Sequence, residues 1–554
     1  MKVVLAGRGL LLALALVAGA FGAPSAEKDG ATVRWCVPEQ LQANCSRLTS
    51  AAGVGIECVS GLDRTECLRL VRNRQADFVM ADPEDLYVAM KMENQDFAVF
   101  AEQRTTEEPA SPFRYEGIML VRAADGFRSL EDLRGKKSCH TGFGRNVGYK
   151  IPVARLQRAG LLKLPVADGA LSTVERELTA LSEFFNAACL PGPYSPHADN
   201  DVLLKHRFAN LCERCDAPAQ CDKQDRYAGY EGAIRCLVEN SGDVAFTKTI
   251  FVRKYFGLPV TPGGTAQPAR NPAARPEDYV YLCEDGTTRP IADGTAPCSW
   301  AQRPWPVLLT NGDYSGTRSQ RLQDATQQLD RFYNGPQSTA PEADRSAVVA
   351  LGIKATNPLV NRKELMAPGD YLRKANYVEV IEREGPYGSA VRLCVTSEPE
   401  RQKCEVLRRV AYSRDVRPAL QCVLKTEEAC VEAVRSGKEA DVVVLNKYSS
   451  QLKAVVTEVY ADGAAKTNGA KNGDASTGAT VYVRPEMDEA EQDSIVHAFI
   501  ALSETFGAGK PNALVFRLFG SFRVEGQADP ISNLMFHDNA AKLAALNKNS
   551  LADN

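Results

Sequence analysis

Residues 138–149 of this chain read Ser-Cys-His-Thr-Gly-Phe-Gly-Arg-Asn-Val-Gly-Tyr. The stretch combines the hydroxyl of Thr141, the guanidinium of Arg145 and the amides of Val147 and Gly148, which we expect at a helix start. A helix start favours negative charge, and arginine offers a planar fork to a planar anion. The glycines let the backbone approach a ligand closely. The stretch therefore predicts an anion-binding loop.

Outside this loop, two parts of the chain resemble one another. Each part has two widely spaced cysteines, a closer pair, a helical stretch and an apolar strand, at 76–79 in the first part and 440–443 in the second. The cysteines are Cys36, Cys45, Cys58 and Cys67 in the first part, and Cys394, Cys404, Cys422 and Cys430 in the second. Four cysteines in the same order at near-equal gaps predict a duplicated unit.

The second copy is shorter than the first. About 240 residues separate the first strand from the Arg-Phe-Tyr-Asn-Gly-Pro element at 331–336, against about 60 residues in the second copy. Residues 461–480 are rich in Gly, Ala, Asn and Lys, and we expect a flexible insert there. We therefore expect an incomplete second copy.

Short apolar runs alternate with helical periods through both copies, for example at 77–80, 118–121, 243–246 and 307–310. This alternation predicts an α/β architecture with mixed sheets and helices on both faces. The long insertion between 118–121 and 307–310 predicts a second subdomain joined to the first by two crossing strands. Such a lobe closes on its ligand by a hinge.

These observations divide the chain. We expect a signal peptide at 1–25, an N-lobe at 26–386 and a truncated C-lobe at 387–554 with its insert at about 461–480. Within the N-lobe we expect subdomain N1 at about 31–114 and 307–386, and subdomain N2 at about 115–306.

The first residues and the composition restrict the function. Lys2 and Arg8 precede an apolar core from Leu10 to Gly22, with small residues after it, which is typical of a secretory signal and too short for a membrane span. We expect a secreted, extracellular protein with no membrane insertion. The net charge is −3 and no basic stripe occurs, so we expect no nucleic-acid partner.

The loop at 138–149 resembles the anion-binding motif of the transferrin family. Residues 229–236, Gly-Tyr-Glu-Gly-Ala-Ile-Arg-Cys, and 242–246, Gly-Asp-Val-Ala-Phe, are similar to a second signature of that family. The chain is identified as a member of the insect-type secreted transferrins. The resemblance implies a bilobal, type II periplasmic-binding-protein-like fold, in which a lobe holds one Fe(III) with a carbonate.

The chemistry of such a site follows from its residues. Fe(III) is a hard ion that prefers anionic oxygen donors, and an adjacent trivalent cation lowers the pKa of a phenol. By the resemblance, Tyr115 and Tyr230 fall on the two tyrosine ligands and Asp82 on the aspartate ligand. Carbonate would bind to Thr141, Arg145, Val147 and Gly148.

Two features depart from the family pattern. Pro83 and Glu84 stand where small residues usually follow the aspartate, which leaves the role of Asp82 open. The segment that matches the histidine ligand ends in Trp305 and Pro306, neither of which is a metal donor. We therefore expect weaker iron binding than in members with four protein ligands, with one or two exogenous anions completing the coordination.

The second copy lacks both motifs, and Asn446 stands where the aspartate would fall. We also find Thr477 or Gly478 near the position of the first tyrosine. We therefore expect one iron per chain, in the N-lobe, released at acidic pH.

The chain has 16 cysteines behind a predicted signal, which favours disulfides over zinc binding at Cys212, Cys215 and Cys221. By analogy with the family, the expected pairs are Cys36–Cys67, Cys45–Cys58, Cys139–Cys236, Cys189–Cys212, Cys215–Cys221, Cys283–Cys298, Cys394–Cys430 and Cys404–Cys422.

Two functions stay open. The first is an extracellular carrier that transports Fe(III) and withholds it from microbes, a monomer with a possible cell-surface receptor. The second is a transferrin-like module that has given up iron and serves an anion, another metal or a protein partner. No catalytic signature occurs, so we expect no enzyme activity.

Overall fold

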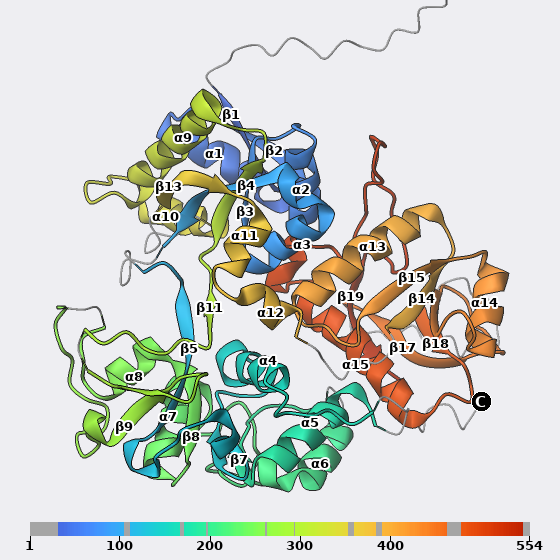
Figure 1. Cartoon of the computed structure of the whole chain (residues 1–554). Coiled ribbons are helices and arrows are strands. Elements are labelled where there is room, and N and C mark those ends of the chain that lie inside the picture. Colours follow the sequence, from blue (N-terminus) through green and yellow to red (C-terminus); the bar gives the residue numbers. More distant parts are fainter. Residues whose placement is uncertain are drawn as a thin grey trace, which may run out of the picture.

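The computed structural model describes residues 32–104, 111–166, 171–195, 198–260, 263–292, 294–352, 359–383, 390–461 and 478–546. The expected signal peptide at 1–25 and most of the insert at 461–480 lie outside these residues. The described residues form three β-sheets, each covered by helices (Figure 1). We call them layers 1, 2 and 3 in the order in which the chain enters them. The fold is mixed α/β, as predicted.

Layer 1 contains a six-stranded sheet in the order β13-β4-β12-β3-β1-β2. Strands β1, β2 and β3 are parallel, and β12 runs antiparallel between β3 and β4. The strands are β1 (Val33–Pro38), β2 (Ile56–Gly61), β3 (Phe78–Ala81), β4 (Phe97–Gln103), β12 (Val307–Asn311) and β13 (Leu359–Met366). Its helices are α1 (Gln42–Ala52), α2 (Arg64–Arg72), α3 (Pro83–Glu93), α9 (Gly316–Asn334), α10 (Glu342–Ala350), α11 (Pro368–Arg373) and α12 (Tyr377–Ile381).

Layer 2 is formed by the chain between β4 and β12. Its seven-stranded sheet has the order β10-β9-β5-β8-β6-β7, with β11 paired to β5. The strands are β5 (Tyr115–Arg122), β6 (Lys137–Cys139), β7 (Ala187–Cys189), β8 (Val244–Lys248), β9 (Tyr279–Leu282), β10 (Thr288–Pro290) and β11 (Ala301–Arg303). Its helices are α4 (Ile151–Arg158), α5 (Thr173–Phe184), α6 (Ala198–Arg207), α7 (Gly229–Glu239) and α8 (Thr249–Tyr255).

Two connections join layers 1 and 2. Strand β4 in layer 1 precedes β5 in layer 2, and β11 in layer 2 precedes β12 in layer 1, so the chain crosses twice (Figure 1). The strands β5 and β11 pair antiparallel, with Tyr115 opposite Arg303. This pairing places Tyr115, the first of the two expected tyrosine ligands, where the chain crosses between layers 1 and 2.

Layer 3 repeats layer 1. Its sheet has the order β15-β14-β16-β18-β17-β19, the strand order and directions of layer 1. The strands are β14 (Val391–Val395), β15 (Leu420–Leu424), β16 (Val442–Leu445), β17 (Lys453–Tyr460), β18 (Thr480–Val483) and β19 (Ala540–Ala545), and the helices are α13 (Glu398–Ser413), α14 (Glu427–Ser436) and α15 (Glu489–Phe506). The duplication predicted from the cysteines is therefore a duplication of one sheet.

A single contact shows how closely the copies match. The backbone amide of Arg34 donates to Asp77 Oδ2 at 2.7 Å, and its guanidinium binds the same carboxylate. Arg392 binds Asp441 in the same way, with 2.8 Å from amide to Oδ2. The second copy has no counterpart of layer 2, because only residues 461–479 lie between β17 and β18.

Side-chain caps fix where several helices begin. Asp63 accepts a hydrogen bond from the amide of Glu66 at the start of α2, and Thr426 caps α14 in the matching place of the second copy by accepting from the amide of Ala429. Ser172 and Glu175 form a capping box at the start of α5. Each such cap satisfies an amide that has no partner within the helix.

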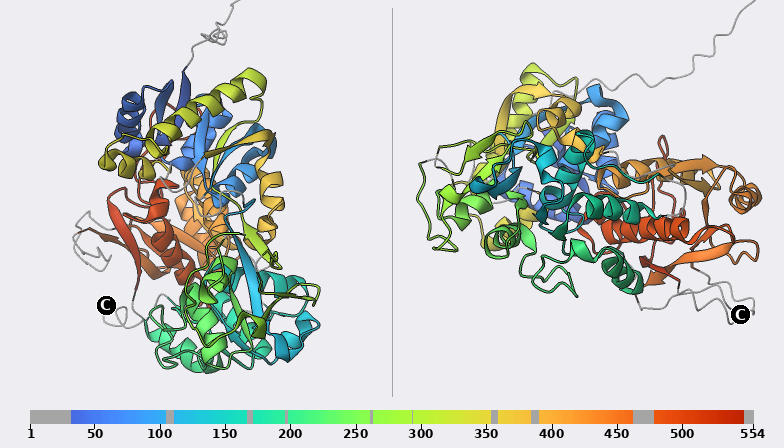
Figure 2. Two further views of the ribbon diagram at one scale, coloured as in Figure 1. Left: turned by 90° about the vertical axis from the view of Figure 1, so that its left-hand side faces the viewer. Right: turned by 60° about the horizontal axis from the view of Figure 1, so that its bottom comes forward.

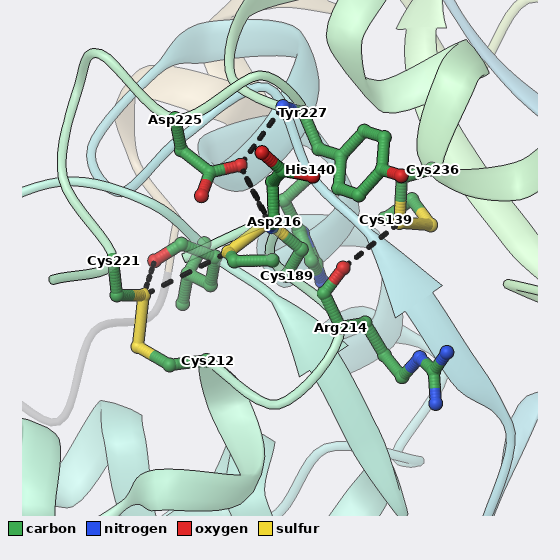
Figure 3. Close-up of a disulfide and its surroundings, with 12 residues drawn as sticks. Cys139, His140, Cys189, Cys212, Arg214, Asp216, Cys221, Asp225, Tyr227 and Cys236 are labelled. Atoms are coloured by element: carbon green, nitrogen blue, oxygen red, sulfur yellow. Dashed lines mark hydrogen bonds between the residues drawn. A yellow bond between two sulfur atoms is a disulfide. The ribbon is translucent and has the colours of Figure 1, made fainter. Parts of the chain in front are cut away.

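The structure contains eight disulfides, six of which are the expected pairs. The pairs Cys189–Cys212 and Cys215–Cys221 were wrong. The observed pairs are Cys189–Cys215 and Cys212–Cys221. Figure 3 labels both cysteines of the second pair and shows Cys189 close to them.

The backbone explains this exchange. The amide of Arg214 donates to Ala188 O and that of Leu190 to Leu211 O, which lays residues 211–214 along β7. Cys212 and Cys215 close a turn, in which the amide of Cys215 donates to Cys212 O at 3.0 Å, and Cys215 lies beside Cys189 with 4.5 Å between their Cα atoms. The sulfurs of Cys189 and Cys215 lie near Asp225 in an arrangement that could hold a metal, but both are consumed by their disulfide. Among the described helices, none is long and apolar enough to cross a membrane.

Candidate metal and anion centre

The anion loop leaves strand β6 and enters a short helix, η5 (Asn146–Lys150). Val147 and Gly148 are its second and third residues, whose amides have no acceptor within a helix. Thr141 is fully buried, and its Oγ1 has no hydrogen-bond partner among the described residues. A buried polar atom without a hydrogen-bond partner costs free energy, so this hydroxyl suits a site in which a bound ligand would supply the missing partner.

Glycine is required where the loop meets this helix. A Cβ built at Gly148 would lie 2.1 Å from Thr141 Oγ1, and Gly142 has a φ of 140°. His140 lies behind the loop, with Nδ1 at 2.6 Å from Gly148 O and Nε2 at 2.9 Å from Ser138 Oγ. Burial lowers the pKa of His140 to about 4, so its imidazole is neutral at neutral pH and supports the loop.

The structure brings Tyr115 and Tyr230 together around a lysine. Tyr115 is the first residue of β5, and Tyr230 is the second of α7. The Nζ of Lys248 lies 3.8 Å from the centre of the Tyr115 ring and 3.9 Å from that of Tyr230. Burial, together with the charges of Arg114 and Arg303, lowers the pKa of Lys248 to about 8.

The raised pKa of Tyr230 suits a metal ligand that loses its proton only when the metal binds. Burial raises the pKa of the Tyr230 phenol, and Tyr115 adds to this effect, while Arg145 and Arg114 oppose it. The phenol is therefore protonated at neutral pH in the metal-free protein. A trivalent cation would supply the charge that makes phenolate favourable.

A hydrogen-bonded network crosses from the tyrosines to layer 1. Asn146 Nδ2 donates to the hydroxyls of Tyr115 at 3.2 Å and Tyr377 at 3.3 Å. The Tyr377 hydroxyl donates to Glu84 Oε1 at 2.9 Å, and Arg303 Nη2 donates to Glu84 Oε2 at 2.8 Å. Burial raises the pKa of Glu84, but Arg303 outweighs it and the pKa falls to about 2. Layers 1 and 2 are thus joined by a buried ion pair.

Asp82 lies at the start of α3, opposite layer 2. Its Oδ2 is 3.0 Å from Arg64 Nη1, and its amide donates to Asp85. Asp82 lines a cavity of about 380 Å³ together with Asn146 and Arg303. The carboxylate therefore faces the cleft but is paired with an arginine.

No histidine donor stands in the segment that leads from layer 2 back to layer 1. Trp305 is fully buried, and its indole N–H donates to Ser111 O at 2.9 Å. In layer 3, Asn446 follows β16 as Asp82 follows β3. Among the residues that the structure describes, no second layer lies beside this position, and none of them is a counterpart of Tyr115 or Tyr230.

Sequence reasoning missed Lys248, Arg303, Glu84 and Asn146 as parts of the centre. Lys248 lies two residues beyond the Gly-Asp-Val-Ala-Phe signature at 242–246, at the end of the same strand, which is a signal that could have been used. The position of Arg303 depends on the pairing of β11 with β5, which no local pattern gives.

Two layers that meet at a pair of crossing strands, with two phenols and an anion-binding loop between them, define a hinged ligand-binding protein. The Transferrin family model matches residues 33–319 and 391–469. A transferrin of Sarcophaga peregrina is 36% identical over 97% of this chain and 96% of its own length. A transferrin of Manduca sexta is 43% identical over 76% of this chain, which spans 60% of that relative's length.

A solved structure supports the same family. The structure of transferrin 1 from Manduca sexta matches with a TM-score of 0.78 and 30% identity, over 93% of this chain and 97% of that one. The chain belongs to the transferrin family, whose members bind and transport iron. Its fold is the bilobal, type II periplasmic-binding-protein-like fold of that family.

Proposed function

We propose that this chain is an extracellular carrier that binds one Fe(III) in the cleft between layers 1 and 2. The observation that supports this most is the convergence of Tyr115 and Tyr230 on one point, marked by their shared contact with Lys248. Two phenolates supply the anionic oxygen donors that Fe(III) prefers. Layers 1 and 2 would be subdomains N1 (about 31–114 and 307–386) and N2 (about 115–306), closing on iron by a hinge.

We propose further that carbonate shares the iron. The unpartnered Thr141 hydroxyl and the amides of Val147 and Gly148 fit a small oxyanion. Arg145 is exposed beside the loop, where its guanidinium could reach such an anion. Protonation of this anion and of the phenolates at acidic pH would weaken the site, so acid should release iron.

In this proposal Asp82 binds iron only if its carboxylate leaves Arg64. To bind iron it would have to leave Arg64, whose pKa rises despite burial because Asp85 and Asp82 face it. The pairing favours a site completed by an exogenous anion, and it fits weaker binding than a site with four protein ligands.

A visible spectrum of the purified protein, titrated with Fe(III) with and without bicarbonate, tests the proposal. We expect a tyrosinate-to-iron charge-transfer band that needs the anion and saturates at one iron per chain. Two irons per chain would show that layer 3 binds metal. The absence of any band would overturn the carrier and favour a module that has given up iron.

A further inference from the structure

Layer 3 contacts both layers of the cleft. Helix α13 packs on α3 of layer 1, and α15 packs on α5 of layer 2 (Figures 1 and 2). Two consecutive residues after α13 bind different layers. Arg414 forms a buried ion pair with Asp85 of layer 1, and Asp415 lies 3.3 Å from Lys150 of layer 2. One peptide unit of layer 3 therefore touches both sides of the cleft.

The contact of layer 3 with layer 1 is wide and varied. It includes a buried ion pair, stacked rings, backbone hydrogen bonds and an exposed ion pair. These are Arg414 with Asp85, Tyr412 with Tyr87 at 6.1 Å between ring centres, Thr65 N with Val515 O at 3.1 Å, Arg517 N with Asp63 Oδ2 at 3.1 Å, and Arg72 with Glu525 at 2.7 Å. We treat layers 1 and 3 as one body.

The contact of layer 3 with layer 2 is smaller and polar. Ser494 Oγ accepts from the amide of Thr173 at 3.0 Å. Arg383, which leads out of layer 1, lies 3.0 Å from Glu177 of α5 and also pairs with Asp415. Around these groups lies a hollow of about 170 Å³. These ion pairs and hydrogen bonds can be replaced by water when the layers separate.

His497 of α15 stands at this polar contact. It lines the hollow against layer 2, and it also lines a second, smaller hollow together with Ser172, Tyr194 and Ser195 of layer 2. The charged groups that share these surfaces with it are Lys150 and Glu177 of layer 2, Arg383 of the segment that leaves layer 1, and Asp415, Arg417 and Asp493 of layer 3.

We propose that layer 3 is a latch on the iron cleft, fixed to layer 1 and released from layer 2 when His497 gains a proton. While latched, layer 3 holds the two sides of the cleft at their present spacing and slows the loss of iron. The truncated lobe thus acts without a metal site of its own. The effect on iron rests on the proposed function, whereas the latch itself does not.

Linkage gives the direction of the pH effect. Burial between the layers lowers the pKa of His497 from 6.5 to about 4, although Asp415 opposes this. Once the layers separate, the imidazole returns to its ordinary value and binds more protons than in the latched state. The latch is therefore fully favoured above pH 6.5 and weakens as pH falls towards 4. At pH 5.5 the shift amounts to about tenfold in the latching equilibrium.

The first experiment needs no iron. Small-angle X-ray scattering of the metal-free full chain at pH 7.5 and pH 5.5 should show a larger radius of gyration in acid. His497→Gln cannot gain the proton and should stay compact. Arg72→Gln breaks the ion pair with Glu525 on the layer 1 side, and should expand in acid as the wild type does.

A wild type that does not expand, or a His497→Gln variant that expands equally, overturns the latch. Asp415→Asn gives a second approach should His497→Gln misfold. It removes the ion pair with Lys150, so it should expand already at pH 7.5, and a compact Asp415→Asn protein also counts against the latch.

The second experiment loads iron and follows its transfer to a chelator by the charge-transfer band. At pH 5.5, His497→Gln should release iron about tenfold more slowly than the wild type, with equal rates at pH 7.5. Equal rates at both pH values contradict the latch as a control of iron. If no variant shows a band, the iron carrier fails, and the scattering result still decides the latch.

Discussion

Thr141 Oγ1 lies so close to the backbone of Gly148 that a Cβ at position 148 would come within 2.1 Å of it. The hydroxyl is buried and has no partner among the described residues. A buried hydroxyl without a partner, next to the free amides of a helix start, is what a binding site for an anion requires. Variants of the anion loop therefore test the site most directly.

Thr141→Val replaces the hydroxyl by a methyl group of similar size. Because the hydroxyl has no protein partner, the free energy of unfolding should stay the same or rise. Anion-dependent iron affinity should fall about 10- to 100-fold, the range for one hydrogen bond to a charged group. Thr310→Val is the matched control, since Thr310 Oγ1 donates to Asp77 O at 2.7 Å. It should cost about 1 kcal/mol of stability and leave iron affinity unchanged.

Tyr115→Phe and Tyr230→Phe each remove one phenol oxygen and leave the ring in place against Lys248. Each variant should lose most of the charge-transfer band in an iron titration. Tyr194→Phe removes a buried hydroxyl of layer 2 that donates to Leu190 O at 3.0 Å, and it should keep the band. A full band in either of the first two variants would remove that tyrosine from the site.

The lysine between the rings should make the metal-free protein depend on pH. Because the folded pKa of Lys248 is about 8 and its ordinary value is 10.5, the unfolded chain binds more protons between these values. The free energy of unfolding should rise with pH across this window. Lys248→Met should be more stable than the wild type below pH 8 and lack this rise, in urea unfolding from pH 7 to 10. Lys374→Met, at an exposed lysine, is the control and should follow the wild-type stability curve. If Lys248→Met also followed the wild-type curve, this would contradict the burial of Lys248.

Arg303→Met leaves the buried carboxylate of Glu84 without its ion pair. The expected cost is about 3–5 kcal/mol in chemical denaturation, against less than about 1 kcal/mol for Arg275→Met at an exposed pair. The Glu84 pKa of about 2 also predicts a loss of wild-type stability as pH falls from 4.5 to 2. Arg303→Met should lack this loss. If the wild type and Arg303→Met lost the same stability between pH 4.5 and 2, the result would argue against the Arg303–Glu84 ion pair.

The two corrected disulfides predict a particular peptide map. Trypsin separates residues 177–205, 208–214 and 215–223, which carry Cys189, Cys212, and Cys215 with Cys221. The observed pairing links all three peptides in one species. The other pairing would give 177–205 joined to 208–214 alone, beside a self-closed 215–223, so mass spectrometry without reduction distinguishes them.

The sequence predicted the features that depend on local or repeated patterns. The matching cysteines and the Ala-Asp strands at 76–79 and 440–443 revealed the duplicated sheet, and the Arg34–Asp77 and Arg392–Asp441 contacts show how far the match extends. The same holds for the strands of layers 1 and 2, because their apolar runs are short and well separated.

Features that depend on register could not be predicted. The choice between Cys212 and Cys215 as the partner of Cys189 depends on the turn that residues 212–215 make beside β7. The Arg64–Asp82 pair joins two helix starts 18 residues apart, and neither residue has a motif around it that names the other. The contact of Arg303 with Glu84 spans 219 residues and exists only because β11 returns beside β5.

The neighbouring strands β4 and β12 run antiparallel, as β17 and β18 do in the second copy. In topological terms, layer 2 with its phenols and anion loop is the loop of a single hairpin, and residues 461–479 are a short version of the same loop. The cost of closing a hairpin rises only slowly with loop length. A ligand-bearing layer can thus be inserted or removed at this one turn without changing the register of any strand in the sheet that carries it.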